Sequence, residues 1–500
     1  MYSPSLKEFL RLSRGANLVP VYKEINADLD TPVSAFLKLR RQEYAFLLES
    51  VEGEEKIARF SFLGSAPHLI FKSRGRNVRI DYPGRKRCRS FKAAVDPLDE
   101  LKKIMRGFRA VRVAGLPRFF GGLVGYMGYD MVRFFEKLPD KNPDQLKLPD
   151  SVFILAKDIL IFDHIKRRIK IVSNVILPQK KRLSRVAALR LYNQALKTIE
   201  DLHGDLVRPL ELNKISPYLS TQQAKRSNSK ISSNLSKLAF EGMVKKAKSY
   251  IKKGDIIQAV LSQRLSLKTA KAPLNIYRSL RSINPSPYMF FLQFKDLFLI
   301  GASPEMLVRC EDGVVRTRPI AGTRPRGRNP AQDRRLAKEL RNDAKEKAEH
   351  LMLVDLGRND LGRVSCAGHV RVDEFMKVEK YSHVMHLVSE VRGRLLKGSD
   401  VYDTLRACFP AGTVSGSPKI RAMEIIDELE NLKRGPYAGC VGYFSFSHNM
   451  DTCITIRTVA IKDSVAYIQA GAGIVADSVP AREYQESLNK AKALLEAIVN

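Results

Sequence analysis

The sequence has few of the features that mark disulfide-stabilised, zinc-binding or membrane-spanning proteins. It contains six cysteines in 500 residues and no tryptophan, and the cysteines are scattered singly without a CxxC pair. This distribution argues against a disulfide framework and favours a reducing compartment, so we expect a cytoplasmic protein. No uncharged apolar run is long enough to cross a bilayer. The opening residues, MYSPSLKEFLRLSRG, lack the apolar core of a signal peptide.

Signatures of nucleotide binding are also missing, since there is no GxxxxGK[ST] loop and no GxGxxG at a strand–helix junction. The formal net charge is +33, and a balance this basic can accompany nucleic-acid binding. However, the lysines and arginines are dispersed among acids, apart from a local cluster at residues 76–89. We therefore favour a solvated basic surface that attracts anionic metabolites. A basic nucleic-acid-binding protein stays open as the alternative from another class.

The hydrophobic content of 44% is enough for a large core, and no solenoid repeat interrupts the chain. Three segments differ in composition. Residues 1–212 mix short strand-like runs with helical patterns, residues 213–237 are rich in Ser, Asn and Gln, and residues 238–500 carry the densest motifs. We interpret them as an N-terminal region, a surface connection and a catalytic region. Because strands and helices do not alternate regularly, the fold class is α+β.

Several elements are predicted from periodicity and turn residues. The predicted helices are 188–206 with a stop at Gly204, 240–256 ending near Gly254, one long charged helix over 334–360, and a C-terminal helix from Pro480. The predicted strand pairs are 151–176, as two strands around Asp163 and His164, and 287–299, turning at Lys295 and Asp296; residues 441–477 are predicted to form an antiparallel meander.

Two carboxylate groups could serve a metal. Glu483, Glu486 and Lys490 are spaced to share one face of the last helix, and Glu346 and Glu349 share a face of the long charged helix. If the two groups converge they suit Mg²⁺, which uses few protein ligands and keeps positions for water and substrate oxygens. Spacing alone favours ordinary solvated helix faces.

Other residues could bind a small anion or move a proton. Glycine turns expose backbone N–H groups, and an arginine beside them could pair with a carboxylate. His386, in YSHVMHLVSEV, is either a core histidine or a catalyst. The candidate anion-binding segments are Gly322-Thr323, Gly412-Thr413, Gly471-Ala472-Gly473 and Arg457.

The ordered motifs of the second half closely resemble the chorismate-utilising enzymes, and among them the anthranilate synthase component I family. The motifs cover nearly all of residues 240–495, whereas the first half matches chiefly through LLES and GGLVGYMGYD. The matching segments are IIQAVLSQR, NPSPYMFFL, GASPEMLVR, RPIAGTRPRG, AEHLMLVDLGRNDLGRV, VMHLVSEVRG, FPAGTVSGSPKIRAMEIIDELE, DTCITIRT and QAGAGIVADSVPAREYQESLNKA.

The resemblance implies two intertwined α/β layers around a large antiparallel β-sandwich, with the site in a cleft. It implies that Glu349 and Glu486 bind Mg²⁺, with Glu483 in support. It also implies that Glu305 protonates the leaving 4-hydroxyl group of chorismate and that His386 serves pyruvate elimination. Thr413 would help fix the ring. The residues implied to hold the substrate's carboxylates and ether side are Gly322, Thr323, Tyr437, Arg457, Gly471, Ala472, Gly473 and Lys490.

Two positions separate the close relatives within this resemblance. Aminodeoxychorismate synthases typically carry a nucleophilic lysine where this chain has Ala321, and isochorismate synthases a water-activating lysine where it has Gln258. Alanine cannot act as a nucleophile and glutamine cannot act as a base. Ammonia is therefore expected to attack directly and give anthranilate. A separate glutamine amidotransferase subunit would supply the ammonia. An aminodeoxyisochorismate or isochorismate-type synthase on the same scaffold is the alternative enzyme.

The resemblance also implies an allosteric tryptophan pocket. A carboxylate, a hydroxyl, exposed strand backbone and apolar walls suit an amino acid with an indole. Without the resemblance, the same segments would be a half-buried strand and a turn. The residues implied to bind inhibitory tryptophan are Leu48, Glu49, Ser50, Pro287, Tyr288 and Met289.

Overall fold

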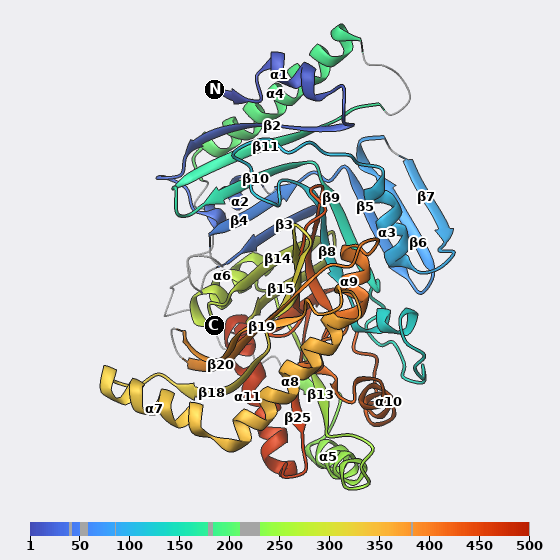
Figure 1. The fold of residues 1–500 in the computed structure, drawn as a ribbon, viewed down its shortest axis with the longest axis vertical. Helices are drawn as coiled ribbons and strands as arrows, with labels where there is room; N and C mark the ends of the chain where they lie inside the picture. The colour runs from blue at the N-terminus through green and yellow to red at the C-terminus, as the bar shows by residue number, and fades with distance from the viewer. Residues whose placement is uncertain are drawn as a thin grey trace.

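The computed structural model describes residues 1–39, 43–50, 59–85, 87–178, 184–210, 231–381 and 384–499. Within these ranges, two antiparallel sheets of 13 and 12 strands make up the centre of the molecule. Helices cover the outer faces of the sheets (Figure 1). None of the described helices is long and apolar enough to cross a membrane.

The larger sheet, sheet A, has the order β1-β2-β11-β10-β4-β3-β14-β15-β24-β25-β13-β12, with β21 paired to β13. Its strands are β1 (Tyr2–Ser3), β2 (Leu18–Asn26), β11 (Arg168–Ile176), β10 (Asp158–Asp163), β4 (Phe60–Ser65), β3 (Tyr44–Glu49), β14 (Tyr288–Phe294), β15 (Leu297–Ser303), β24 (Thr458–Lys462), β25 (Val465–Ile474), β13 (Gln258–Lys268), β12 (Ser232–Ser233) and β21 (Gly416–Ser417).

Sheet B has the order β18-β20-β17-β16-β23-β22-β8-β9-β5-β6-β7, with β19 paired to β20. Its strands are β18 (Ile320–Pro325), β20 (Val384–Arg394), β17 (Val314–Thr317), β16 (Met306–Glu311), β23 (Met450–Ile454), β22 (Cys440–Ser445), β8 (Gly122–Met127), β9 (Ser151–Ala156), β5 (Leu69–Arg74), β6 (Asn77–Tyr82), β7 (Arg87–Lys92) and β19 (Arg371–Lys380).

The helices pack against the faces of these sheets. The α-helices are α1 (Leu6–Leu12), α2 (Pro32–Leu39), α3 (Pro97–Arg106), α4 (Arg185–Val207), α5 (Lys237–Lys252), α6 (Pro273–Ile283), α7 (Pro330–Asn342), α8 (Ala344–Gly362), α9 (Val401–Cys408), α10 (Lys419–Leu429) and α11 (Pro480–Val499). Short 3₁₀ turns are η1 (Pro83–Arg85), η2 (Tyr129–Phe134) and η4 (Gly412–Val414).

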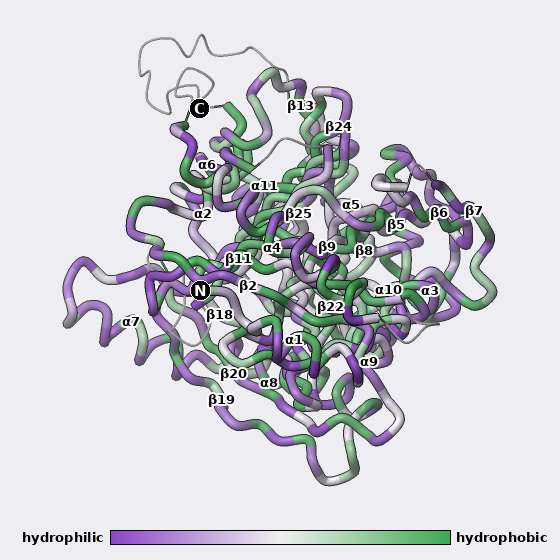
Figure 2. Tube along the Cα trace, turned by 90° about the horizontal axis from the view of Figure 1, so that it is seen from above, coloured by the Kyte–Doolittle hydropathy of each residue, from purple (hydrophilic) through white to green (hydrophobic). Residues whose placement is uncertain are grey.

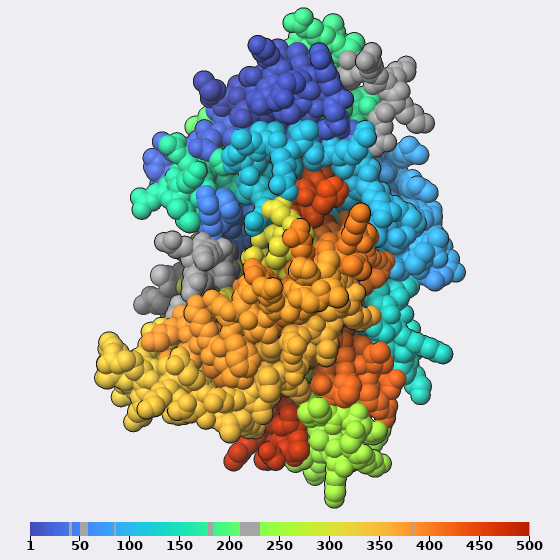
Figure 3. Space-filling view, viewed as in Figure 1, coloured from blue at the N-terminus to red at the C-terminus, as the bar shows by residue number. Residues whose placement is uncertain are grey.

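The main core lies between the two sheets, as the expected β-sandwich requires. Tyr126 of sheet B lies 5.9 Å from Phe294 of sheet A, and Tyr443 lies 6.0 Å from Phe62 (ring centroids). A second apolar cluster packs helices α1, α2, α4, α6 and α11 on the other face of sheet A. Hydrophobic segments concentrate at the centre of the chain trace, and α7 is mainly hydrophilic at its edge (Figure 2). Both α7 and α8 lie on the face shown in Figure 3.

The two halves of the sequence share both sheets. Strand β3 pairs with β14 in sheet A, and β8 pairs with β22 in sheet B. The predicted connection at 213–237 falls largely outside the described residues; of it, only residues 231–237 are described, and they include β12. This interleaving agrees with the α+β fold expected from the resemblance.

Helix α5, helix α11 and the β14–β15 hairpin with Lys295 at positive φ confirm their predictions. The helix predicted to stop at Gly204 continues to Val207, because Leu206 is still buried against the second core. The single long helix predicted over 334–360 is wrong. Asp343 adopts an extended conformation there, and its side chain accepts from the backbone N–H groups of Lys345 and Glu346, so it ends α7 and caps α8.

Two predicted strand groups turn out to divide between the sheets. Residues 151–176 form three strands, with β9 in sheet B and the β10–β11 hairpin in sheet A. The predicted meander is two hairpins, β22–β23 in sheet B and β24–β25 in sheet A. The chain changes sheet between β23 and β24, and again between β15 and β16. These crossovers position the candidate site.

Candidate active site

The two sheet crossovers bring Glu305 and Arg457 close together. Glu305 lies between β15 and β16, and Arg457 lies between β23 and β24. The backbone N–H of Ile454 donates to the carbonyl of Glu305 at 3.1 Å, and that of Ala302 donates to the carbonyl of Arg457 at 3.0 Å. The crossovers therefore fix each other. Side chains at these points leave the regular in–out alternation of a strand and can face one common space.

Glu305 has the properties of a proton donor. Burial raises the pKa of Glu305 to about 8, an effect only partly offset by the Thr413 hydroxyl and by the charge of Lys490. The Thr413 hydroxyl donates to Oε1 of Glu305 at 3.0 Å. At neutral pH the carboxyl group is therefore mainly protonated. The structure brings Glu305 and Thr413 together as a pair.

The predicted metal ligands come from α8 and α11. Burial raises the pKa of Glu349, and the neighbouring charges of Glu346 and Glu486 raise it further. Burial likewise raises the pKa of Glu483, again with a contribution from Glu486. The two helices thus bring carboxylates within electrostatic range of one another, and a cation would relieve their repulsion.

This donor set fits Mg²⁺ better than a metal that needs a full protein cage. Within the described part of the chain, no group of three His, Cys, Asp or Glu side chains is arranged to hold a metal ion. Mg²⁺ binds through one or two carboxylates and takes its other oxygens from water and substrate. Glu346 is also held by Arg324 at 3.2 Å. Glu349 and Glu486 remain the ligands that the resemblance implies.

Basic groups lie beside the carboxylates. Lys490 pairs with Glu486 at 2.7 Å, and its ammonium group donates to the carbonyl of Gly471 at 3.1 Å. Nη1 of Arg457 donates to the carbonyl of Lys490 at 3.2 Å. Burial lowers the pKa of Arg457, and the charges of Tyr437 and Glu486 oppose that shift. An incoming substrate carboxylate would satisfy this half-buried guanidinium.

The GAG segment approaches its neighbours too closely for side chains. A Cβ on Gly471 would lie 2.5 Å from the carbonyl of Leu261 and 3.0 Å from the Tyr437 hydroxyl. A Cβ on Gly473 would lie 2.4 Å from Nε2 of Gln258. Backbone groups are therefore what this segment can offer a ligand. Ala472 is buried in the apolar cluster with α5 and α10, so only its backbone can reach the site.

His386 is attached to the same site through β20. Its Nδ1 lies 2.9 Å from the carbonyl of Gly322 and 3.1 Å from the Thr323 hydroxyl. Burial lowers the pKa of His386; its hydrogen bond to the Gly322 carbonyl opposes this shift and the charge of Arg457 adds to it, so the net effect favours the neutral ring. Gly322 has φ +62°, a conformation that favours glycine. The ring of Tyr381 lies 5.7 Å from that of His386; sequence analysis missed this tyrosine although it belongs to the same YSHVMH segment.

The residues predicted to bind tryptophan lie elsewhere, on or beside the neighbouring strands β3 and β14. Met289 pairs with Glu49 in the β3–β14 ladder. They line a cleft of about 1150 Å³ that also includes Ser50 and Tyr288. Within the described structure the Ser50 hydroxyl is buried without a hydrogen-bond partner. The Glu49 carboxylate is held by Arg281 at 3.2 Å.

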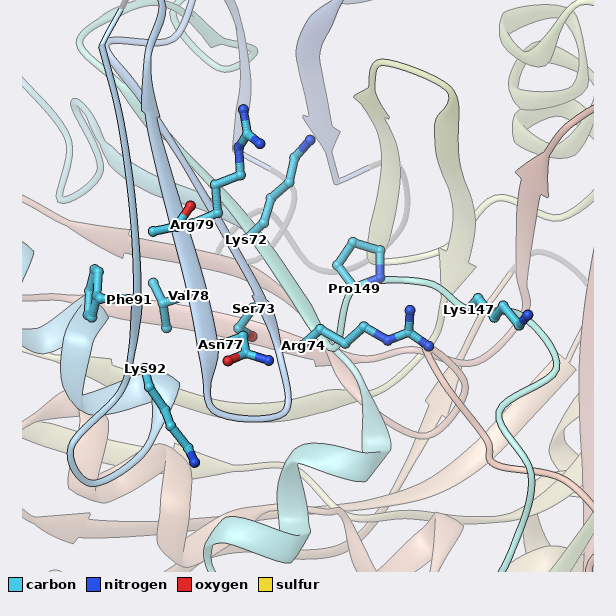
Figure 4. A pocket seen from close by; sticks show the side chains of 11 residues that line it. Lys72, Ser73, Arg74, Asn77, Val78, Arg79, Phe91, Lys92, Lys147 and Pro149 are labelled. Atoms are coloured by element: carbon cyan, nitrogen blue, oxygen red, sulfur yellow. The ribbon is translucent and has the colours of Figure 1, made fainter.

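The basic cluster at residues 76–89 falls on the β5–β6–β7 extension. Lys72, Arg74, Arg79, Lys92 and Lys147 surround a hollow of about 630 Å³ there (Figure 4). Asp144 pairs with Arg74 at 3.0 Å, and Asp81 pairs with Arg79 at 2.9 Å. The hollow is thus partly neutralised by its own acids and contains none of the predicted catalytic residues.

Comparison with known proteins identifies the class. Residues 43–496 match the family described as chorismate binding enzyme, and the chain therefore belongs to that family. It is 48% identical over 499 residues to anthranilate synthase component 1 of Acetivibrio thermocellus, which covers 100% of this chain and 99% of the relative. Within the family the chain thus belongs with the anthranilate synthase component 1 proteins.

Solved structures agree with this placement. The crystal structure of anthranilate synthase component I from Streptococcus pneumoniae superposes with a TM-score of 0.76 at 38% identity, over 94% of this chain and 98% of that one. The menaquinone-specific isochorismate synthase of Escherichia coli superposes with a TM-score of 0.68 at 20% identity, over 99% of both chains. The second likeness shows the shared fold alone.

Proposed function

We propose that this chain is the ammonia-using, Mg²⁺-dependent synthase subunit of anthranilate synthase, with the catalytic roles given below. The enzyme converts chorismate to anthranilate in tryptophan biosynthesis. The observation that supports the chemistry best is the buried Glu305, whose raised pKa suits a proton donor, together with the side chains at positions 321 and 258. Ala321 and Gln258 occupy the positions at which related enzymes place a lysine.

Substrate binding follows from charge. Chorismate carries two carboxylates, and Arg457, Lys490 and the exposed backbone N–H groups at Gly471 and Gly473 suit them. Glu349 and Glu486 would hold Mg²⁺, which when bound supplies positive charge for the ring carboxylate. A substrate gripped at both ends presents its ring to Glu305 in a fixed orientation.

In the first half-reaction, ammonia adds at C2 and the 4-hydroxyl group leaves. Hydroxide is a poor leaving group, so Glu305 gives it a proton and water departs. The double bonds shift, ammonia loses one proton, and aminodeoxyisochorismate remains. Thr413 holds the Glu305 carboxyl in place through their hydrogen bond.

In the second half-reaction, the C2 proton and the enolpyruvyl group leave, and the ring becomes aromatic. A neutral imidazole can accept a proton, and the lowered pKa of His386 favours the neutral ring. His386 therefore serves pyruvate elimination, with Gly322 and Thr323 orienting its ring. The products are anthranilate and pyruvate in equal amounts.

Ammonia comes from a separate glutamine amidotransferase subunit, as the component 1 designation of the relatives implies. Tryptophan, the end product of the route, inhibits by binding the cleft that Ser50, Tyr288 and Met289 line. It can do so only by stabilising a less active conformation, so chorismate must in turn weaken tryptophan binding.

The test is an anthranilate fluorescence assay with purified chain, chorismate, MgCl₂ and ammonium chloride at mildly alkaline pH. Anthranilate should form without any second subunit, and chelation of Mg²⁺ should stop it. Adding glutamine alone should give no product until a glutaminase subunit is present. Formation of isochorismate, or of an amino product that is never converted to anthranilate, would overturn the assignment.

A further inference from the structure

A fully buried guanidinium lies behind the predicted substrate residues. Arg434 is 2% exposed, and its Nε and Nη2 donate to the two carboxylate oxygens of Glu430 at 2.9 and 2.6 Å. Nη1 also donates to the carbonyl of Val414, and Nη2 to the carbonyl of Val260, both at 2.7 Å. One rigid fork thus joins three separate segments of the chain. Strand β13 and helix α10, which flank it, are neighbours (Figure 1).

Both carbonyl groups that accept from Arg434 belong to residues that neighbour predicted site residues. Val414 ends η4 immediately after Thr413, whose hydroxyl donates to Glu305 at 3.0 Å. Val260 lies opposite Gly473 in the β13–β25 ladder. The fork therefore fixes the η4 turn relative to the strand that supports the GAG segment.

The partners of Arg434 extend the same connection. Glu430 accepts from the backbone N–H and the hydroxyl of Ser262 at 2.8 and 2.7 Å, and Ser262 lies opposite Gly471. The guanidinium of Arg434 also lies 5.5 Å from the ring centroid of Tyr437, within the range of a cation–π contact. The guanidinium also lies 4.8 Å from the ring centroid of Tyr129 in η2. The hydrogen-bonded segments and Tyr437 all carry or back a predicted substrate residue.

Stability alone explains such a pair poorly. Burying two charges carries a desolvation penalty of several kcal/mol per ion, and apolar replacements of buried ion pairs are often neutral or stabilising. What apolar residues cannot reproduce is a planar fork that holds two carbonyls and a carboxylate in fixed directions. The pair is therefore better suited to positioning than to stabilisation.

We propose that Arg434, oriented by Glu430, is a positioning residue of the synthase site. It holds η4 and Tyr437 against β13 and thereby keeps Thr413 on Glu305. The proposal rests on the proposed function, because it assigns Arg434 to the reaction that Glu305 serves. Arg434 acts through these neighbours and does not contact chorismate.

The test is a double-mutant cycle on turnover with ammonium as the nitrogen source. Arg434→Lys keeps a positive charge, but a lysine cannot reach both carbonyls and the carboxylate at once. A misplacement of about 1 Å can lower turnover roughly 10²-fold, so Arg434→Lys should lower kcat by about 10- to 100-fold. Thr413→Val should lower kcat in the native background but by less than about threefold in the Arg434→Lys background.

A pH profile supplies a second readout. The groups that face Glu305 are the Thr413 hydroxyl and the Lys490 ammonium, and both lower the pKa that burial raises. Asp360, which pairs with Lys419 outside the lining, and the thiol of Cys408 line the same small cavity. Losing the Thr413 contact should move the basic limb of kcat to higher pH in Thr413→Val and in Arg434→Lys alike. A purely structural role would lower the amount of active enzyme without moving that limb.

Arg406→Lys is the control, because Nη2 of Arg406 also donates to both oxygens of a carboxylate, that of Asp96 at the start of α3. It should leave kcat and the pH profile as in the native chain. Glu430→Gln is a second variant, which replaces Arg434→Lys if that variant fails to fold. It should lower kcat and move the basic limb in the directions expected for Arg434→Lys, but by smaller amounts. The proposal would be overturned if the effects of Arg434→Lys and Thr413→Val on kcat simply multiplied in the double variant. It would also be overturned if neither single variant moved the basic limb of kcat. A native chain that makes no anthranilate would instead overturn the proposed function.

Discussion

Replacing Glu305 by glutamine is expected to lower turnover and raise stability together. Burial raises the pKa of Glu305 from 4.5 to about 8, whereas in the unfolded chain the carboxyl ionises near its ordinary value. The protonated group therefore favours the folded state fully below about pH 4.5. That contribution is lost as the pH rises toward 8, because unfolding then releases a proton. A pKa difference of this size corresponds to roughly 5 kcal/mol.

Glutamine cannot ionise, so Glu305→Gln removes this pH dependence while it keeps the size of the side chain. With roughly 2.1 cal/mol/K of unfolding entropy per residue, the variant should melt roughly 5 °C above the native chain at pH 8 and near it at pH 5. Differential scanning calorimetry at the two pH values measures this. Glu8→Gln, at an exposed carboxylate, is the control and should change neither melting temperature.

Turnover should change in the opposite direction. Loss of a general acid typically lowers kcat by about 10²- to 10⁴-fold, and KM for chorismate should change little because Glu305 does not bind the carboxylates. In the native chain, kcat at constant free ammonia should fall as the pH rises through about 8, since only the protonated carboxyl can donate. A variant that turns over normally, or that is no more stable than the native chain at pH 8, would refute the assignment of a buried acid.

Four further substitutions test the other roles. Glu349→Gln or Glu486→Gln removes a charged ligand and should abolish Mg²⁺-stimulated anthranilate formation while the circular dichroism spectrum is unchanged; near-normal turnover would exclude these residues as ligands. His386→Met should release aminodeoxyisochorismate, detected by mass spectrometry, and anthranilate at the native rate would make His386 structural. Ser50→Phe should block the part of the cleft beside Ser50 and relieve tryptophan inhibition with uninhibited turnover retained; the chain has no tryptophan, so ligand fluorescence reports binding, and absence of binding to the native chain would refute the pocket.

Local patterns were sufficient to predict elements whose signals lie within one segment. The amphipathic pattern of α5 and the proline that opens α11 located those helices. The break between α7 and α8 also had a local signal, since Asp343 followed three residues later by Glu346 is typical of a helix N-terminus. The helical periodicity on both sides obscured that signal.

Membership of a sheet could not be predicted from the same patterns. The hairpins β22–β23 and β24–β25 have similar alternation, yet they belong to different sheets. Which sheet a strand joins depends on pairings far away in sequence, such as β8 with β22. The crossovers that carry Glu305 and Arg457 could therefore not be predicted from the sequence.

The candidate site shows the same limit. Spacing indicated that Glu346 and Glu349 share one helix face, and Glu483 and Glu486 another, but it could not indicate that the faces meet. The electrostatic influence of Glu486 on the pKa of Glu349 is a property of the packing of α8 and α11. Arg434 gave no signal at all, because a lone arginine after a helix is ordinarily a surface residue.

The central claim is that ammonia attacks chorismate directly and that one chain completes both half-reactions. The most direct measurement is turnover of chorismate with ¹⁵N-ammonium and Mg²⁺, followed by NMR and mass spectrometry of products and protein. The account predicts ¹⁵N in the amino group of anthranilate, one pyruvate per anthranilate, and no chorismate-derived adduct on the chain. Isochorismate as the product, or a covalent adduct, would contradict it.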